Sequence, residues 1–124
     1  AMTAHVIYED IDPKNCATIS SKVIKKIIRK EIGFKGVLFS DDVTMKALKS
    51  GSAKNATEAL KAGCDLVIHC NASLKEREEV LLATKKHMIK SDSWIWSKFK
   101  GRSVPRKIDH DKFYSWLLSV TDGY

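Results

Sequence analysis

Two adjacent carboxylates, Asp41 and Asp42, follow a short apolar run near the middle of the chain, residues 36–40 (Gly-Val-Leu-Phe-Ser). Paired carboxylates are residue types that can act as nucleophile, general acid or general base. Successive side chains on a strand point in opposite directions, so only one of the two can face a given pocket. The pair alone therefore indicates one functional carboxylate, and it leaves open a helix cap or a metal ligand.

The apolar run before these aspartates is one of three, and the starts of the runs lie about 30 residues apart, as in strand–helix–strand crossovers. Each run is almost continuously apolar, which is typical of strands buried on both faces of a parallel sheet. The runs are residues 2–8, 36–40 and 64–70. The pattern predicts an α/β fold with three consecutive β–α units, as a small open sheet or as part of a doubly wound sheet or (β/α)₈ barrel. A complete barrel needs about 250 residues.

Helices are predicted between and after these strands. The first should be an amphipathic α-helix ended by Gly33, with apolar residues at 3.6-residue spacing: Ile19, Val23, Ile24, Ile27, Ile28 and Ile32. The second should cover residues 55–62 and end at Gly63. A capping box of Ser73 and Glu76 should open the third, which extends to about residue 90.

The positive charge of the chain is concentrated near its C-terminal end. The net charge is +7, and residues 85–107, with eight Lys or Arg and one acid, carry the whole excess. We therefore divide the chain into a β–α part, residues 1–90, and a basic, helical C-terminal tail, residues 91–124. The mixed aromatic and basic residues 94–102 could stack on bases and neutralise phosphates. Packing of the aromatics on the domain is the favoured interpretation, so we do not expect a nucleic-acid partner.

Several function classes are not expected. The sequence contains no run of about 18 apolar residues, the length needed to cross a membrane. Its N-terminal residues do not have the pattern of a secretory signal. Cys16, Cys64 and Cys70 are odd in number and lack CxxC spacing, which predicts reduced thiols rather than disulfides or a metal site. Together these features predict a cytoplasmic protein.

Three segments occur in a characteristic order: residues 2–8 (MTAHVIY), 31–45 (EIGFKGVLFSDDVTM) and 59–65 (ALKAGCD). They resemble the last three strands of glycoside hydrolase family 3, and most closely its bacterial β-N-acetylhexosaminidases, in which a GFxGVxFSDDxxM segment holds the nucleophile. The resemblance covers roughly residues 1–90. It implies the last three β–α units of a (β/α)₈ TIM-type barrel, with a retaining mechanism on terminal β-linked N-acetylglucosamine of peptidoglycan fragments. It also implies that neither a metal nor an organic cofactor is needed.

The same resemblance assigns individual residues. It implies that Asp41 is the catalytic nucleophile and that Asp42 is its structural neighbour. It places His5 near the substrate-binding pocket. Met45, one turn after Asp41, is expected to line the same substrate-binding site through an apolar contact. For His5, a histidine of the barrel wall without direct chemistry is the competing interpretation. For Met45, a core methionine is the competing interpretation.

The sequence departs from the family in one large respect. In the family a His–Asp acid/base pair, a Lys–His pair and a sugar-binding Arg lie upstream, and this sequence contains none of these motifs. We therefore expect a partial enzyme that is inactive alone and requires a missing N-terminal barrel portion as its partner. The alternative is a non-catalytic remnant or a basic binding module. In either case Val6, Leu38 and Val67 are expected to lack an opposing barrel wall, and the sheet edges to stay open.

Overall fold

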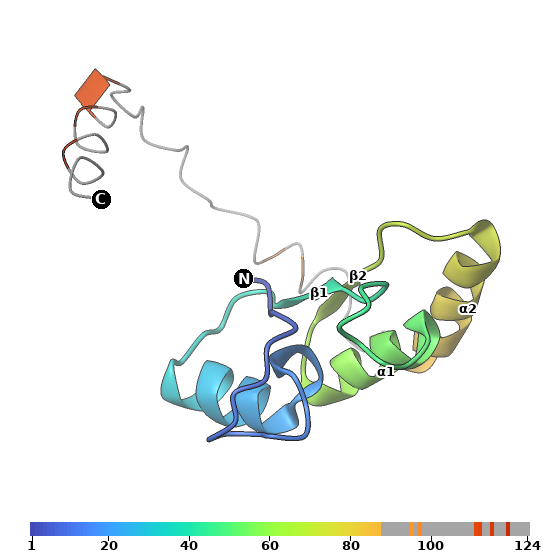
Figure 1. Ribbon diagram of the computed structural model, residues 1–124, viewed down its shortest axis with the longest axis horizontal. Coiled ribbons are helices and arrows are strands. Elements are labelled where there is room, and N and C mark those ends of the chain that lie inside the picture. The colour runs from blue at the N-terminus through green and yellow to red at the C-terminus, as the bar shows by residue number, and fades with distance from the viewer. Residues whose placement is uncertain (88–94, 96, 98–110, 113–114, 116–118, 120–124) are drawn as a thin grey trace.

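The computed structural model describes residues 1–87, 95, 97, 111–112, 115 and 119. The predicted boundary at residue 90, and most of the predicted tail, lie outside these residues. The elements follow in the order η1 (Ala17–Ile19), η2 (Lys22–Glu31), β1 (Phe39–Asp42), α1 (Ser52–Ala62), β2 (Leu66–Ile68), α2 (Leu74–Thr84) and η3 (Lys85–His87). The order alternates strands and helices from β1 onward, so the predicted α/β character is confirmed (Figure 1).

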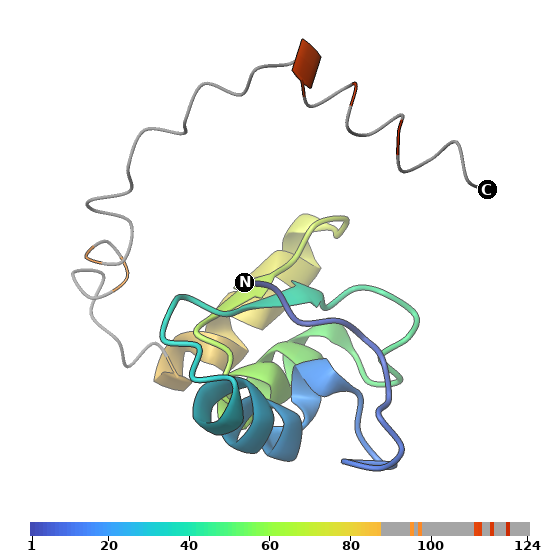
Figure 2. The same ribbon diagram turned by 90° about the vertical axis from the view of Figure 1, so that its left-hand side faces the viewer.

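The sheet is small and parallel. β1 pairs with β2 through Phe39 opposite Leu66 and Asp42 opposite Ile68, with an irregularity in the register between them. On the other side of β1, Met2 forms a single parallel bridge to Phe39. The three predicted strand segments therefore lie side by side in the expected order. The helices η2, α1 and α2 lie on one side of this sheet (Figures 1 and 2).

The strands are shorter than the sequence predicts. The run of residues 2–8 leaves the sheet after its one bridge, and the chain turns where the amides of Ile11 and Asp12 bond the carbonyl of Tyr8. Val6 is 50% exposed, because no described layer covers it. β1 starts at Phe39 rather than Gly36. The carbonyl of Gly36 accepts a hydrogen bond from the guanidinium of Arg29 at 2.8 Å, so it is not available for strand pairing.

The first helix differs in type from the prediction. η2 is a π-helix: the amide of Ile32 bonds the carbonyl of Ile27, five residues earlier, at 2.8 Å. A π-helix has more residues per turn than the 3.6 of an α-helix, so apolar positions at α-helical spacing rotate away from one another. Ile24 is therefore buried whereas Ile32, the last position of the predicted face, is 69% exposed. The predicted left-handed glycine is confirmed, with φ of 72° at Gly33.

The other two helices agree better with the sequence. α1 begins three residues earlier than predicted and ends at the predicted Gly63, whose φ is 124°. A Cβ at Gly63 would lie 2.9 Å from Ile24 Cγ2, so both backbone conformation and close packing require glycine. The capping box that opens α2 is present between Ser73 and Glu76. α2 ends at Thr84 and continues as the short η3, so its α-helical part is shorter than expected.

The core lies between the sheet and these helices. One cluster comprises Ile24, Leu38, Ala59, Ala62 and Cys64, and a second comprises Cys16, Val43, Leu48, Ala56 and Val80. Val67 packs against both clusters. Leu38 is 1% exposed, so the expectation that it would lack an opposing wall is wrong. Its side chain packs with Ile24 of η2 and Ala59 of α1, and small alanines allow this close approach.

A partly buried ion pair connects η2 to the residues that directly precede β1 and β2. The side chain of Asp65 is 1% exposed and lies 2.6 Å from Arg29 Nη2, and it also accepts a hydrogen bond from the amide of Leu38 at 2.9 Å. Arg29 Nη1 donates to the carbonyls of Phe34 and Gly36. Because both charges have partners, their desolvation is offset and the segment entering β1 is held in place. Among the described residues, no helix is long and apolar enough to span a bilayer.

Candidate active site at the end of β1

The carboxylate of Asp42 joins the end of β1 to the segment after β2. Its Oδ1 accepts the amide of Thr44 at 3.0 Å and the amide of Cys70 at 3.2 Å, and its Oδ2 accepts the Thr44 hydroxyl at 2.8 Å. Three donors from two segments thus satisfy this side chain. Asp42 therefore has the contacts of a structural residue that fixes the strand ends relative to each other.

The same contacts control the charge of Asp42. Desolvation raises the pKa of the Asp42 carboxyl, but the bonds from the Thr44 amide and hydroxyl and the Cys70 amide lower it, as does the nearby His69. The net result is a pKa below the ordinary value of 3.8. Asp42 is therefore a stable anion at neutral pH, which suits a residue that accepts hydrogen bonds.

The backbone of Asp42 brings the three predicted site residues together. Its carbonyl accepts the amide of Met45 at 3.1 Å and lies 2.9 Å from Nε2 of His5. Its amide donates to Oδ1 of Asp41 at 2.8 Å. Asp41, His5 and Met45 thus surround one peptide unit, although His5 is 36 positions before Asp41 in the sequence.

Asp41 differs from its neighbour in how its carboxylate is used. Its side chain is partly exposed, and within the described chain its one hydrogen bond is to the adjacent Asp42 amide. That bond orients Oδ1 and leaves Oδ2 without a hydrogen bond among the described residues. Of the two aspartates, Asp41 is therefore the one whose carboxylate is available to react with another molecule.

His5 is held by a buried polar network. Its Nδ1 lies 2.8 Å from the hydroxyl of Thr18, which in turn accepts the hydroxyl of Thr3 at 3.0 Å. Thr18 is fully buried and Thr3 nearly so. A carbonyl only accepts, so Nε2 of His5 carries the proton given to Asp42, and Nδ1 can accept from Thr18. With both ring nitrogens used internally, the geometry favours a supporting role for His5, whereas substrate contact stays a prediction.

Met45 lies at the surface rather than in the core, with 45% of the residue exposed. Its amide bond to the Asp42 carbonyl closes the turn after β1 and places it beside Asp41. A contact with substrate stays a prediction for Met45, and its exposure is compatible with one. No group of three or more potential metal ligands gathers in the portion of the chain that the structure describes.

Sequence reasoning missed several supporting residues. Thr44 lies two positions after Asp42, and an Asp side chain commonly bonds the backbone two residues on, so this contact had a local signal. Thr3 and Thr18 had no local signal, because Thr18 forms hydrogen bonds with Thr3 and His5, which lie 15 and 13 positions away in the sequence. Cys70 also had none, since it contributes its backbone amide rather than its side chain.

Comparison with known proteins decides the family. Residues 1–95 match the profile described as "Glycosyl hydrolase family 3 N terminal domain". The chain belongs to glycosyl hydrolase family 3. The resemblance drawn from the FSDD segment is therefore confirmed.

Individual relatives agree with this assignment. A β-hexosaminidase of Nitrosomonas eutropha is 51% identical over 72 residues, which are 56% of this chain and 20% of the relative. A solved family 3 β-N-acetylglucosaminidase of Paenibacillus sp. matches with a TM-score of 0.61 and 28% identity, over 87% of this chain and 24% of that one. NagZ of Neisseria gonorrhoeae, solved with N-trifluoroacetyl-D-glucosamine, matches with a TM-score of 0.57 and 33% identity, over 78% of this chain and 27% of that one. The chain thus spans about a quarter or less of these relatives.

Proposed function

We propose that this chain forms the last three β–α units of the (β/α)₈ barrel of a retaining β-N-acetylhexosaminidase. In this proposal it supplies the catalytic nucleophile, Asp41. The observation that carries the proposal is the contrast between the two aspartates. The Asp42 carboxylate accepts three internal hydrogen bonds, whereas the partly exposed Asp41 carboxylate accepts one and keeps its second oxygen without a partner among the described residues. In barrel enzymes the strand C-terminal ends form the active site, and Asp41 lies near the end of β1.

The chemistry follows from this arrangement. An Asp41 oxygen attacks the anomeric carbon, a C–O bond to the enzyme forms, and the bond to the leaving-group oxygen breaks. A general acid outside the described residues gives the leaving oxygen its proton. Water then attacks the anomeric carbon, the sugar is released, and Asp41 returns as a carboxylate. Asp42, His5 and the two threonines keep the peptide that carries Asp41 in place during both steps.

The substrate class is proposed from the relatives. They are named as β-hexosaminidases or β-N-acetylglucosaminidases, and one was solved with an N-acylglucosamine analogue. We therefore propose terminal β-linked N-acetylglucosamine as the sugar. Peptidoglycan fragments as its source and the cytoplasm as the compartment are proposed from the sequence analysis alone. Exposed Met45 beside Asp41 supplies an apolar contact for the sugar, and His5 acts mainly through the Asp42 carbonyl.

The 124 residues alone should be inactive in this proposal. The sequence has no counterpart of the acid/base and sugar-binding motifs that the resemblance implies for the whole domain. Loss of general acid catalysis costs about 10² to 10⁴ in rate, and loss of the groups that orient the sugar costs more. Activity therefore requires the remainder of the domain.

A complementation assay tests the proposal. The chain would be mixed with the part of the N. eutropha β-hexosaminidase that precedes the matching stretch, and hydrolysis of a chromogenic N-acetyl-β-glucosaminide would be followed. We expect no hydrolysis from either piece and measurable hydrolysis from the mixture. Hydrolysis by the isolated chain at the rate of a complete relative would contradict the proposal. A complex that forms but does not hydrolyse would favour the non-catalytic remnant.

A further inference from the structure

The pairing of β1 with β2 contains one extra residue on β1. Phe39 lies opposite Leu66, but Asp42 lies opposite Ile68, so β1 advances by one residue more than β2 between these two pairs. In regular pairing Asp41 would lie opposite Ile68. An extra residue of this kind is a β-bulge, and bulges are common next to active sites, where they redirect a side chain.

The bulge changes which side chains face the helices. Leu38 and Ser40 alternate regularly along the chain, and their exposed fractions are 1% and 0%. Regular alternation would next place Asp42 on this buried side and Val43 on the other. Instead Val43 is 0% exposed and packs in the core, whereas Asp41 and Asp42 are both partly exposed. The bulge therefore keeps two successive aspartates out of the core.

The same extra residue releases one backbone amide from the strand pairing. The carbonyl of Ile68 accepts the amide of Val43 at 3.0 Å, whereas regular pairing would give it the amide of Asp42. The Asp42 amide instead donates to Oδ1 of Asp41 at 2.8 Å. The hydrogen bond that orients the Asp41 carboxylate is therefore a consequence of the bulge.

Ser40 is the residue whose side chain bonds across the bulge. Its hydroxyl accepts the amide of Ile68 at 3.0 Å, and Ser40 is fully buried. In regular pairing the Ser40 carbonyl would be the acceptor for this amide. A buried amide without an acceptor is unfavourable, so an acceptor on the Ser40 side chain stabilises the irregular pairing.

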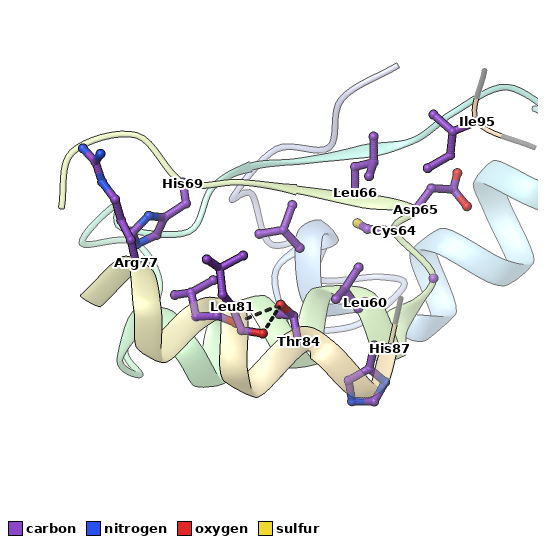
Figure 3. A pocket seen from close by; sticks show the side chains of 13 residues that line it. Leu60, Cys64, Asp65, Leu66, His69, Arg77, Leu81, Thr84, His87 and Ile95 are labelled. Atoms are coloured by element: carbon purple, nitrogen blue, oxygen red, sulfur yellow. Dashed lines mark hydrogen bonds between the residues drawn. The ribbon is translucent and has the colours of Figure 1, made fainter. Parts of the chain in front are cut away.

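The neighbours of Ile68 on β2 have a different environment. Val67 and His69 line a cavity of about 680 Å³ between β2 and α2 (Figure 3). Neither Ile68 nor Ser40 belongs to this lining, and neither does Asp41. The bonds at the bulge are therefore separate from the cavity.

We propose that Ser40 is a positioning residue for the nucleophile. By accepting the Ile68 amide, its hydroxyl stabilises the bulge, and the bulge leaves the Asp42 amide to hold the Asp41 carboxylate. Because Ser40 is fully buried, it acts through the backbone and does not touch the substrate. The inference rests on the proposed function, because it takes Asp41 as the nucleophile.

Two buried serines provide a matched test. Ser40 and Ser20 are both 0% exposed, and each hydroxyl accepts a backbone amide, at 3.0 Å from Ile68 and at 3.2 Å from Val23. Ser20 also donates to Asp12, and it bonds η2 rather than the sheet. Replacing either serine by alanine removes a comparable buried hydrogen bond, but only Ser40→Ala removes one at the bulge.

Hydrolysis by the complemented enzyme would be measured for the wild type and three variants. Ser40→Ala should lower kcat about 10- to 100-fold and keep KM within about twofold, because it misplaces the nucleophile and not the groups that bind the sugar. Ser20→Ala should keep kcat within about twofold of the wild type. Ser40→Thr keeps the hydroxyl and should retain kcat within about fivefold. If the added methyl group prevents folding, the two alanine variants still decide.

Backbone amide NMR of the chain alone gives a second readout that needs no turnover. In Ser40→Ala the signals of Asp42 and Val43 should shift, because Asp42 would replace Val43 on the Ile68 carbonyl. In Ser20→Ala both signals should stay in place. Unchanged signals in Ser40→Ala, unchanged kcat, or an equal loss of kcat in both alanine variants overturns the inference. Shifted signals with a wild-type mixture that never hydrolyses overturn only the proposed function.

Discussion

Two regions of the molecule are built in opposite ways. The rim comprises Asp42 and the residues bonded to it at the end of β1, and the flank comprises the edge of β2 that faces away from β1 and the side of α2 next to it. At the rim, the Asp42 peptide and carboxylate make hydrogen bonds with other residues, among them His5, Asp41, Thr44 and Cys70, and the nearby Thr18 is fully buried. Along the flank, a strand edge is open, a cavity borders it and leucines of α2 are exposed. The described residues complete the rim, whereas they leave the flank open.

This difference separates two requirements of an enzyme. The geometry around Asp41 depends on contacts within residues 3–70, so it can form before any partner binds. The flank depends on chain that the described residues do not supply. Under the proposed function, Asp41 would be a preformed nucleophile on a chain that provides one part of a catalytic site. The experiments below test each half of the comparison.

The largest effect is expected for the nucleophile in the complemented enzyme. Asp41→Ala should lower kcat on the order of 10⁴-fold or more, because loss of a nucleophile removes the covalent pathway. The matched control is Asp10→Ala, an exposed aspartate in the loop that follows residues 2–8, which should keep wild-type activity. Steady-state hydrolysis of a chromogenic N-acetyl-β-glucosaminide measures both. Unchanged activity of Asp41→Ala would remove Asp41 from the chemistry.

The core under the rim should be the most sensitive to packing. Leu38→Ala removes a side chain that is 1% exposed and should destabilise the chain by about 2–5 kcal/mol. Leu82→Ala, at an exposed position of α2, should change stability by less than about 0.5 kcal/mol. Urea unfolding followed by circular dichroism measures the difference. Similar midpoints for the two variants would contradict the placement of Leu38 in the core.

Loss of the Asp42 carboxylate charge should weaken the rim by a smaller amount. Asp42→Asn keeps an acceptor for Thr44 but loses the charge-assisted bonds, which should cost about 1–3 kcal/mol in unfolding free energy. Activity of the complemented enzyme should fall less than in Asp41→Ala. If Asp42→Asn lost as much activity as Asp41→Ala without loss of stability, the roles of the two aspartates would be reversed.

The smallest effect is a dependence of stability on pH. The folded-state pKa of Asp42 is below its ordinary value, despite desolvation, because Thr44 and Cys70 bond the carboxylate. As the pH falls, the Asp42 carboxylate is therefore protonated in the unfolded chain before it is protonated in the folded chain. The stability that Asp42 contributes is present above about pH 4 and is lost as the pH falls further. Urea midpoints between pH 3 and pH 6 should decline less steeply at acid pH in Asp42→Asn than in the wild type. Equal slopes would contradict the lowered pKa.

Local sequence signals predicted the parts of the molecule that depend on local physics. Gly33, Gly63 and the Ser73–Glu76 capping box are where the sequence places them, since each satisfies a backbone requirement of its own helix end. The FSDD segment identified the family and the position of Asp41. These features needed no knowledge of distant contacts.

Features without a readable local signal were not predictable from the sequence. The π-helical bonding of η2 is one, because a 3.6-residue apolar pattern gives no sign of bonds to the fifth residue. The start of β1 at Phe39 depends on the hydrogen bond that Arg29 donates to the Gly36 carbonyl. The Thr3–Thr18–His5 network joins residues far apart in sequence, and Leu38 is covered by helices rather than left open.

Covalent trapping tests most directly whether Asp41 is the nucleophile. The complemented enzyme would be incubated with a slowly turned-over fluorinated N-acetylglucosaminide, digested, and its labelled peptide sequenced by mass spectrometry. A retaining mechanism with Asp41 as nucleophile predicts one glycosyl adduct, on Asp41, and none in Asp41→Ala. An adduct on Asp42, or on a residue of the added partner, would contradict the assignment.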